Sequence, residues 1–207
     1  MPLGPALARL RGRALLASLA LVAALSAPAD AQVDPKLFVY GDSLGYQTKK
    51  HLPRLLSDWR VRQKIDFGLE VRGVVRGLDR RRSTLAPVVH ISAGTSDDAS
   101  QTHRFRRRVR RIMRIVGSER CVVWANVWRP ARPYWPGEKR LNRVLAEEAG
   151  RRPNLIVVDW HSMVKANRDW LTGDHVHVYP EGERARARAV ARAARMCHER
   201  LAAESSP

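Results

Sequence analysis

The sequence contains few of the residues on which metal-binding, collagen-like or low-complexity proteins depend. There are only two cysteines among 207 residues, and no set of cysteines and histidines has the spacing of a zinc site. The 12 prolines and 13 glycines are too few for a collagen, and no glycine-rich phosphate-binding loop is present. With 44% hydrophobic residues the chain is too apolar for disorder. We therefore expect one well-buried domain without a cofactor.

Acidic residues are scarce relative to basic ones. The chain has 20 of them against 38 lysines and arginines, which gives a net charge of +18. Six of the basic residues are lysine, so 32 are arginine. This excess fits two explanations equally well, a compositional bias of the genome or an anionic partner. The arginine clusters at 80–82, 104–111 and 184–195 are expected to be solvated helix faces, and nucleic acid is not an expected partner.

The N-terminal apolar run is too short to span a membrane. It extends from Ala14 to Leu25, whereas a spanning helix needs roughly 20 residues. Arginines at positions 9, 11 and 13 precede it, and an Ala-Asp-Ala cleavage site follows at 29–31, without a lipoprotein cysteine. This layout is typical of a secretory signal peptide. We expect residues 1–31 to be the signal and residues 32–207 to be a secreted, periplasmic or cell-wall-associated domain with no transmembrane span.

Short apolar runs alternate with helical patterns along the rest of the chain. Strands are predicted over 37–40, 65–71, 88–92, 121–125 and 155–159. Helices are predicted over 44–60, with a break or kink at Pro53, and over 103–116, 138–149 and 181–203. Uninterrupted apolar strands suit a sheet that is covered on both faces. The pattern predicts a three-layer α/β/α domain with a mostly parallel five-stranded sheet, whose ligands bind at the carboxyl ends of the strands. We expect the protein to be a monomer, although the pattern itself does not determine this.

Two polar motifs occur where such a sheet binds ligands. Gly41-Asp42-Ser43-Leu44 follows the first predicted strand, where Asp or Ser commonly caps a helix but a Ser hydroxyl can also face the crevice. Asp174-His175-Val176-His177 lies just before the last helix. A nucleophilic serine needs an imidazole as base, and the imidazole needs a carboxylate to fix its tautomer. The two motifs together therefore indicate a catalytic triad of Ser43, His177 and Asp174.

These motifs, in this order, resemble those of the SGNH (GDSL-type) hydrolases, and the resemblance extends from about residue 37 to 197. It implies a flavodoxin-like SGNH fold in which Ser43 is the nucleophile, His177 the base and Asp174 the orienting acid. It also implies an oxyanion hole that contains the Ser43 amide and a glycine after the second strand. Gly73 fits that glycine best, with Gly77 as the second choice.

The third family block, G-x-N-D, departs from the family pattern. The chain reads Gly94-Thr95-Ser96-Asp97 after the third predicted strand, so Ser96 replaces the asparagine that donates an amide hydrogen to the oxyanion. Loss of one such donor can lower the rate by about 10²–10³. We expect Ser96 to take part in the oxyanion hole, with a weaker or differently arranged set of donors.

The resemblance implies an exported serine esterase that cleaves O-acyl esters, above all O-acetyl groups on extracellular or cell-wall carbohydrate. Acyl transfer to a cell-wall sugar hydroxyl is the second interpretation, because secreted members resemble peptidoglycan O-acetyltransferases. A third is a non-catalytic wall- or glycan-binding protein that keeps the fold but has lost activity at Ser96. The expected partners are an acylated carbohydrate or other small ester, and an anionic cell-wall polymer.

An aromatic segment after the fourth predicted strand is a candidate for substrate binding. Trp128, Tyr134 and Trp135 lie between residues 126 and 135 in a proline-containing loop. Their rings either stack on a sugar or acyl group, or pack against the body of the domain. The sequence leaves both alternatives open.

The two cysteines can form a disulfide in an exported protein or remain as two buried thiols. Cys121 begins the fourth predicted strand, at the end of the sheet away from the crevice. The last helix runs back from the crevice, and the 16 residues from Glu181 to Cys197 carry it about 24 Å at 1.5 Å per residue. This distance brings Cys197 to the level of Cys121, although the helix need not lie beside that strand.

Overall fold

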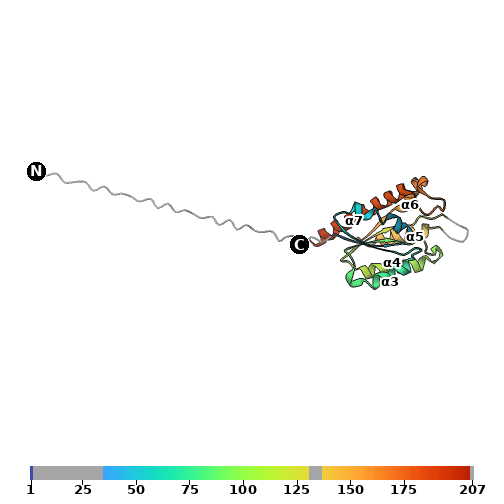
Figure 1. Ribbon diagram of the computed structural model, residues 1–207. Coiled ribbons are helices and arrows are strands. Elements are labelled where there is room, and N and C mark those ends of the chain that lie inside the picture. Colours follow the sequence, from blue (N-terminus) through green and yellow to red (C-terminus); the bar gives the residue numbers. More distant parts are fainter. Residues whose placement is uncertain (2–34, 131–136, 206–207) are drawn as a thin grey trace. The chain divides into compact units, whose positions relative to one another are not determined.

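The computed structural model describes residue 1 and residues 35–130 and 137–205, which include one compact α/β unit (Figure 1). Its strands are β1 (Lys36–Gly41), β2 (Arg60–Ile65), β3 (Val88–Ser92), β4 (Cys121–Ala125) and β5 (Leu155–Val158). Its α-helices are α1 (Ser43–Thr48), α2 (Leu52–Leu55), α3 (Val71–Asp79), α4 (Thr102–Val116), α5 (Lys139–Ala149), α6 (Trp160–Ala166) and α7 (Pro180–Ser205). Short 3-10 turns occur at η1 (Arg82–Thr84), η2 (Ala99–Gln101) and η3 (Arg168–Trp170). Residues 2–31 of the predicted signal peptide lie outside the described residues.

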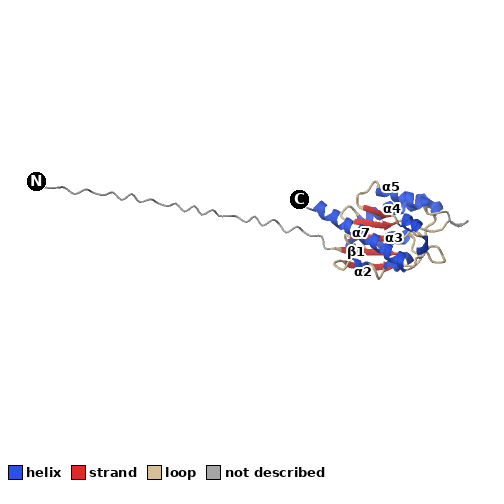
Figure 2. Cartoon of the chain, turned by 90° about the horizontal axis from the view of Figure 1, so that it is seen from above, coloured by secondary structure: helices blue, strands red, loops and turns tan. Residues whose placement is uncertain are grey.

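All five strands run parallel in one sheet, in the order β2-β1-β3-β4-β5. Seen from above, they lie side by side beneath the helices (Figure 2). Gly41 at the end of β1 pairs with Ile65 of β2 on one side and with Ser92 of β3 on the other, so these three strands end at the same level. β3 and β4 are buried along their whole length, as their apolar runs predict. The predicted α/β class with a five-stranded parallel sheet is confirmed.

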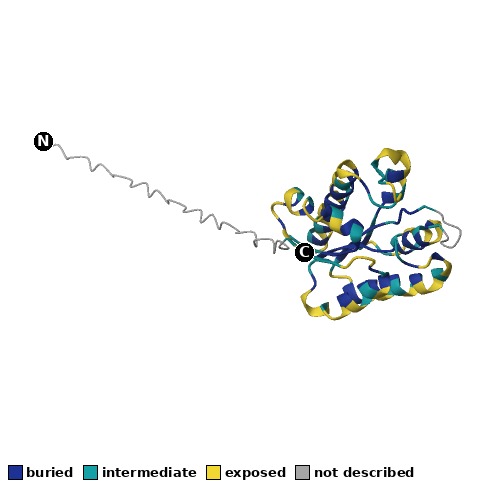
Figure 3. Cartoon of the chain, turned by 45° about the vertical axis from the view of Figure 1, so that its right-hand side comes forward, coloured by how far each residue is buried: buried dark blue, intermediate teal, exposed yellow. Residues whose placement is uncertain are grey.

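Helices cover both faces of the sheet and bury a hydrophobic core against each. α3, α4 and α5 pack on one face through a cluster that includes Val74 and Phe105. α2, α6 and α7 pack on the other through a cluster that includes Leu52 and Trp160. The helix faces turned toward the sheet are buried and the outer faces are exposed (Figure 3). In the described ranges, no helix is both long and apolar enough to cross a membrane.

The predicted second strand over 65–71 is wrong. β2 ends where that prediction begins, at Ile65, and helix α3 starts at Val71. β2 is an edge strand that pairs only with β1, so its sequence RVRQKI is partly exposed and carries no apolar run. α3 has apolar residues at 71, 74, 75 and 78, which is a helical period, but two glycines within it weaken the pattern. A Cβ at one of them, Gly77, would lie 2.1 Å from the Tyr40 hydroxyl, so close packing requires glycine there.

The predicted helix over 44–60 is divided into two short helices. α1 ends at Thr48, α2 covers Leu52–Leu55, and β2 begins at Arg60. Pro53 lies in the first turn of α2, where its missing N–H is tolerated, so it begins a helix and does not kink one. The other predicted helices agree with α4, α5 and α7 to within a few residues, and the seven-residue helix α6 is an addition.

A disulfide joins Cys121 at the start of β4 to Cys197 on α7, with their Cα atoms 5.5 Å apart. Both residues are buried in the core between α7 and the sheet. The bond closes a long segment, because the two cysteines are 76 positions apart in the sequence. Of the two alternatives that the sequence leaves open, the structure therefore has the disulfide.

Candidate active site

Ser43 is the first residue of α1, two residues after the end of β1 at Gly41. The buried Asp42 caps this helix, because its Oδ1 accepts the amide hydrogens of Leu44 and Gly45 at 3.0 and 3.1 Å. The turn is tight: a Cβ at Gly41 would lie 2.8 Å from the Ile65 side chain and 3.1 Å from the Gly45 backbone. The capping role considered for the GDSL motif thus belongs to Asp42, which leaves the Ser43 hydroxyl for other contacts.

Asp174 organises the loop that carries His177, between η3 and α7. Its Oδ1 accepts hydrogen bonds from the amides of Val176 and His177, at 2.9 and 3.0 Å, and from the Thr172 hydroxyl at 2.8 Å. At the tip of the loop, His175 has a φ of 59°, a left-handed conformation that is uncommon for residues other than glycine. These bonds hold the loop in one conformation and leave Asp174 Oδ2 free to face His177.

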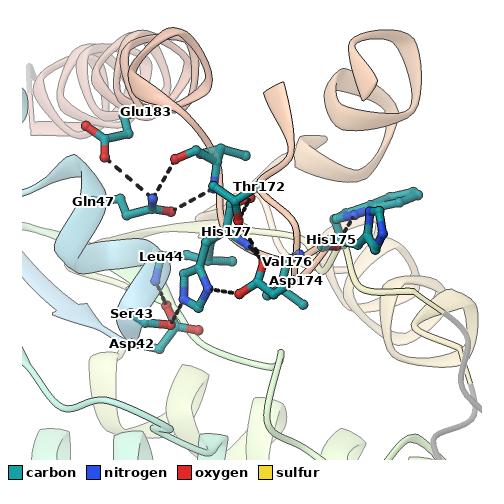
Figure 4. A network of polar contacts seen from close by, with 12 residues as sticks. Asp42, Ser43, Leu44, Gln47, Thr172, Asp174, His175, Val176, His177 and Glu183 are labelled. Atoms are coloured by element: carbon teal, nitrogen blue, oxygen red, sulfur yellow. Dashed lines mark hydrogen bonds and ion pairs between the residues drawn. The ribbon is translucent and has the colours of Figure 1, made fainter. Parts of the chain in front are cut away.

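The side chains of Asp174, His177 and Ser43 form one chain of hydrogen bonds, with His177 in the middle (Figure 4). His177 Nδ1 lies 2.5 Å from Asp174 Oδ2, and His177 Nε2 lies 2.8 Å from Ser43 Oγ. Because a carboxylate only accepts, Nδ1 carries the hydrogen and Nε2 of the neutral ring accepts the Ser43 hydroxyl. Partial burial works to raise the pKa of Asp174, but the hydrogen bonds from His177 and from the loop amides together hold it below its usual value. Asp174 is therefore ionised at neutral pH.

Gln47 joins the two halves of this arrangement, and the sequence interpretation missed it. Its amide nitrogen donates to the Val178 carbonyl at 2.7 Å, and its amide oxygen accepts the Val178 N–H at 3.3 Å. The same nitrogen lies 3.5 Å from a carboxylate oxygen of Glu183 on α7 (Figure 4). Gln47 is one helical turn after Ser43, and this spacing on one helix face was the available signal. It fixes α1 against the residue that follows His177.

A buried polar network lies beneath Ser43, on the α7 side of the sheet. Ser92, at the end of β3, donates its hydroxyl to Asp42 Oδ1 at 2.8 Å and accepts a hydrogen bond from Arg186 Nη2 at 3.0 Å. The Arg186 guanidinium, on α7, lies 4.8 Å from the centre of the Trp160 ring. Burial raises the pKa of Asp42 and lowers the pKa of Arg186 to about 10. The charge of each group partly offsets the effect of burial on the pKa of the other. Arg186 thus remains charged at neutral pH and is the counter-charge of Asp42.

The prediction for Gly73 in the oxyanion hole is not supported, because the strand placement behind it is wrong. Gly73 lies within α3, and its amide donates to the Glu70 carbonyl at 2.8 Å. Gly77 lies further along the same helix, against Tyr40. The glycine that follows β2 is Gly68, which has a φ of 70° and adjoins the cavity-lining Phe67. The interpretation missed Gly68 because the predicted strand included it.

The segment Gly94–Asp97 is held in place by three hydrogen bonds. Asp97 Oδ2 accepts the Val71 amide hydrogen at 2.8 Å, at the start of α3. The buried Arg129 donates to the carbonyls of Thr95 and Asp97 at 2.6 and 2.8 Å. Ser96 is partly exposed and lines a hollow of about 240 Å³ beside Asp97 and α4. It does not line the cavity at Ser43, and its part in an oxyanion hole stays a prediction.

Trp128 supports the His177 loop from within the protein. It is 6% exposed, and its indole N–H donates to the His175 carbonyl at 3.1 Å. One face of its ring is covered by the Arg168 guanidinium, 4.2 Å from the ring centre. These contacts favour the packing alternative for Trp128, and its part in substrate binding stays a prediction. The other two predicted rings, Tyr134 and Trp135, lie outside the described residues.

A cavity of about 660 Å³ opens beside Ser43 and His177. Its other walls include the rings of Tyr46 and Phe67 and the side chains of Lys49, Lys50 and Glu183. A site of this volume accommodates a ligand much larger than an acetyl group. Among the described residues, no group of three or more His, Cys, Asp or Glu side chains is placed to hold a metal ion.

In sequence, no family model and no curated protein matches the chain. In three dimensions it resembles the catalytic domain of peptidoglycan O-acetyltransferase A from Streptococcus pneumoniae, with a TM-score of 0.66 and 14% identity over 81% of this chain and 96% of that one. A carbohydrate esterase family 3 protein from Talaromyces cellulolyticus aligns with a TM-score of 0.65 and 11% identity, over 80% of this chain and 98% of that one.

A member of the lipolytic G-D-S-L family from Veillonella parvula gives a TM-score of 0.62 at 14% identity, over 74% of this chain and 94% of that one. All three alignments cover at least 74% of this chain and at least 94% of the other chain. These neighbours are SGNH (GDSL-type) hydrolases, and the chain has their three-layer α/β/α fold.

Proposed function

We propose that the protein is a serine esterase that removes short acyl groups, above all acetyl, from carbohydrate. The observation that carries this proposal is the continuous hydrogen-bond chain from Asp174 through His177 to Ser43, at 2.5 and 2.8 Å. A non-catalytic binding protein has no need for this geometry, so the enzyme interpretation is preferred. Structural neighbours that include esterases and an O-acetyltransferase domain support it.

In the proposed reaction, Ser43 Oγ attacks the ester carbonyl carbon while its proton moves to His177 Nε2. Asp174 stabilises the imidazolium that forms. The amides of Leu44 and Gly45, near the start of α1, already donate to Asp42. Among the first three amides of this helix, the Ser43 amide is therefore the one left to donate to the oxyanion. His177 then gives its proton to the alcohol oxygen as the carbon–oxygen bond breaks. Water, deprotonated by His177, then attacks the acyl carbon, and His177 returns the proton to Ser43 Oγ as the bond from the acyl carbon to Ser43 breaks and the acid leaves.

Acyl transfer is the second candidate, because the catalytic domain of a peptidoglycan O-acetyltransferase is among the structural neighbours. The two reactions share the acyl-enzyme and differ only in whether water or a sugar hydroxyl attacks it. The signal-peptide pattern supports action outside the cytoplasm, in the periplasm, at the cell wall or in the medium. A cell-wall carbohydrate is accordingly the substrate that fits both candidates.

Turnover of p-nitrophenyl acetate tests the proposal. The wild-type protein and Ser83→Ala, which alters an exposed serine far along the chain from the motif, should both release nitrophenol, whereas Ser43→Ala should not. Addition of an oligosaccharide acceptor, with mass spectrometry of the sugar, distinguishes the candidates: acetylated sugar indicates transfer and free acetate indicates hydrolysis. Equal activity of Ser43→Ala and wild type would refute the mechanism.

A further inference from the structure

Two aromatic rings are exposed beside the candidate nucleophile. Tyr46, on α1, is 51% exposed, and Phe67, just after β2, is 70% exposed. Their ring centres are 5.3 Å apart with 47° between the planes, and both line the 660 Å³ cavity with Ser43. Removal of such rings from water is favourable, so paired exposed rings at a site point to a ligand that covers them.

The cavity also carries positive charge from the end of α1. Lys49 and Lys50 both line it, and both are exposed. Lys50 Nζ lies 3.2 Å from a Glu183 carboxylate oxygen, so this pair is largely neutral. Within the described residues no acidic partner of Lys49 is found, and its backbone is held by Gln63, whose amide nitrogen donates to the Lys49 carbonyl at 2.9 Å. Lys49 therefore supplies the uncompensated charge.

The size and lining of the cavity indicate which half of an ester it holds. An acetyl group fills only a small part of 660 Å³. A long acyl chain is a poor match, because Lys49, Lys50 and Glu183 would have to lose water against an alkyl chain without new partners. A sugar ring suits the site, since its C–H face packs on aromatic rings while its polar groups remain hydrogen-bonded. The cavity therefore fits the alcohol half of the ester.

We propose that this cavity binds an acidic sugar, whose ring packs against Tyr46 and Phe67 and whose carboxylate or phosphate pairs with Lys49. This inference rests on the proposed esterase function and specifies its substrate: an O-acetyl ester of a negatively charged carbohydrate. The overall excess of positive charge on the chain adds a long-range attraction for the same substrates.

Matched substrates measure the predicted charge preference. An O-acetylated methyl hexuronide and the corresponding methyl hexoside differ only in a carboxylate in place of a hydroxymethyl group, and an O-acetylated hexose phosphate tests phosphate as the source of charge. We expect kcat/KM to be up to about fivefold higher for the acidic sugars at low salt, which corresponds to about 1 kcal/mol, the upper value for an exposed ion pair. The preference should decrease at 0.5 M salt, where exposed charges are screened.

Variants distinguish a local site from the general charge of the protein. Lys49→Glu should abolish or reverse the preference, whereas Lys165→Glu, the same charge change at an exposed position of α6, should keep it. Tyr46→Ala with Phe67→Ala should raise KM for both sugars. Lys165→Glu should also hydrolyse p-nitrophenyl acetate at near wild-type rate, because Lys165 belongs neither to the triad nor to the cavity. Equal kcat/KM for acidic and neutral sugars, or equal effects of Lys49→Glu and Lys165→Glu, would overturn the inference.

A binding measurement separates this inference from the esterase proposal. Saturation-transfer NMR with unacetylated methyl glucuronide and methyl glucoside on Ser43→Ala requires no turnover. Stronger binding of the glucuronide, lost in Lys49→Glu, supports the acidic-sugar site even if aryl acetate hydrolysis fails and the esterase proposal falls. Equal binding of the two sugars overturns the site while leaving the esterase proposal intact.

Discussion

Replacement of Arg186 by methionine should destabilise the protein in a pH-dependent way. Arg186 lies 2% exposed on α7 and reaches the buried Asp42 through the Ser92 hydroxyl, with hydrogen bonds of 3.0 and 2.8 Å. Methionine fills a similar volume without charge, so the Asp42 carboxylate keeps its helix-capping contacts but loses its counter-charge. The imidazole of His90 is not expected to replace it, because burial, the largest cause that lowers the pKa of His90 to about 3, remains in the variant.

We expect the free energy of unfolding to fall by about 3 kcal/mol at pH 8, the lower end of the 3–5 kcal/mol found when one partner of a buried ion pair is removed. The lower end applies because Arg186 Nε and Nη1 are buried without a hydrogen-bond partner among the described residues. Such unpaired groups destabilise the folded state, and methionine removes them. Loss of the contact between the Arg186 guanidinium and the Trp160 ring adds to the destabilisation.

The pH dependence follows from the pKa of Asp42. Burial already raises this pKa above the usual 3.8, and loss of Arg186 should raise it further. Because protonated Asp42 is tolerated better in the folded state than ionised Asp42, its raised pKa stabilises the folded state below pH 3.8. This stabilisation is lost as the pH rises through the folded-state pKa of Asp42. The variant should therefore be closest to wild type near pH 4 and progressively less stable toward neutral pH.

Urea unfolding at several pH values measures this effect, with Arg188→Met, an exposed arginine on the same helix, as the control. Arg188→Met should change stability by less than about 0.5 kcal/mol at every pH. Asp42→Asn combined with Arg186→Met should cost less than the sum of the single changes, because the unpaired charge is gone. A pH-independent loss below 1 kcal/mol, or strict additivity, would refute the assignment of Arg186 as the counter-charge.

Four further predictions test other parts of the structure. Asp174→Asn should lower kcat for aryl acetate by about 10⁴ through the wrong His177 tautomer, and a kcat within tenfold of wild type would contradict this. Ser96→Asn should raise that rate if Ser96 contributes to the oxyanion hole, and an unchanged rate would exclude it. Cys121→Ser with Cys197→Ser should lower the unfolding free energy by about 4 kcal/mol, given their separation of 76 residues, and denaturant curves with and without reductant would show it. Glu148→Gln should cost about 3 kcal/mol in the same assay, because this buried carboxylate accepts hydrogen bonds from arginines of α4 and of the turn after α5; a loss below 1 kcal/mol would contradict this.

The elements that the sequence predicts well are those that burial alone determines. β1, β3 and β4 are apolar runs because helices cover both faces of the sheet, and α4 has an apolar stripe that faces β3 and β4. β2 could not be located in this way, since an edge strand keeps polar side chains such as Arg62 and Lys64. Because the predicted second strand ended at residue 71 and not at Ile65, the first glycine after it became Gly73, and Gly68 was not considered for the oxyanion hole.

The candidate triad could be predicted because its chemistry requires specific residue types in short motifs after strands. Asp174 and His177 lie in one turn, and Ser43 lies in the other motif, so two local patterns were sufficient. The residues that position them could not be found in this way. Arg186 is one of many arginines in an alanine- and arginine-rich helix, and only the packing of α7 on the sheet distinguishes it from the exposed Arg188. Gln47 is likewise an ordinary helix residue until α1 is placed beside the His177 loop.

The most direct test of the central claim is whether Ser43 reacts as an activated nucleophile. Incubation with a fluorophosphonate, followed by mass spectrometry of the intact protein and of its peptides, locates any adduct. We predict a single adduct on the peptide that contains Ser43, which forms much more slowly in His177→Ala than in wild type because the hydroxyl then has no base. No adduct, an adduct on another serine, or an equal rate in His177→Ala would contradict the account.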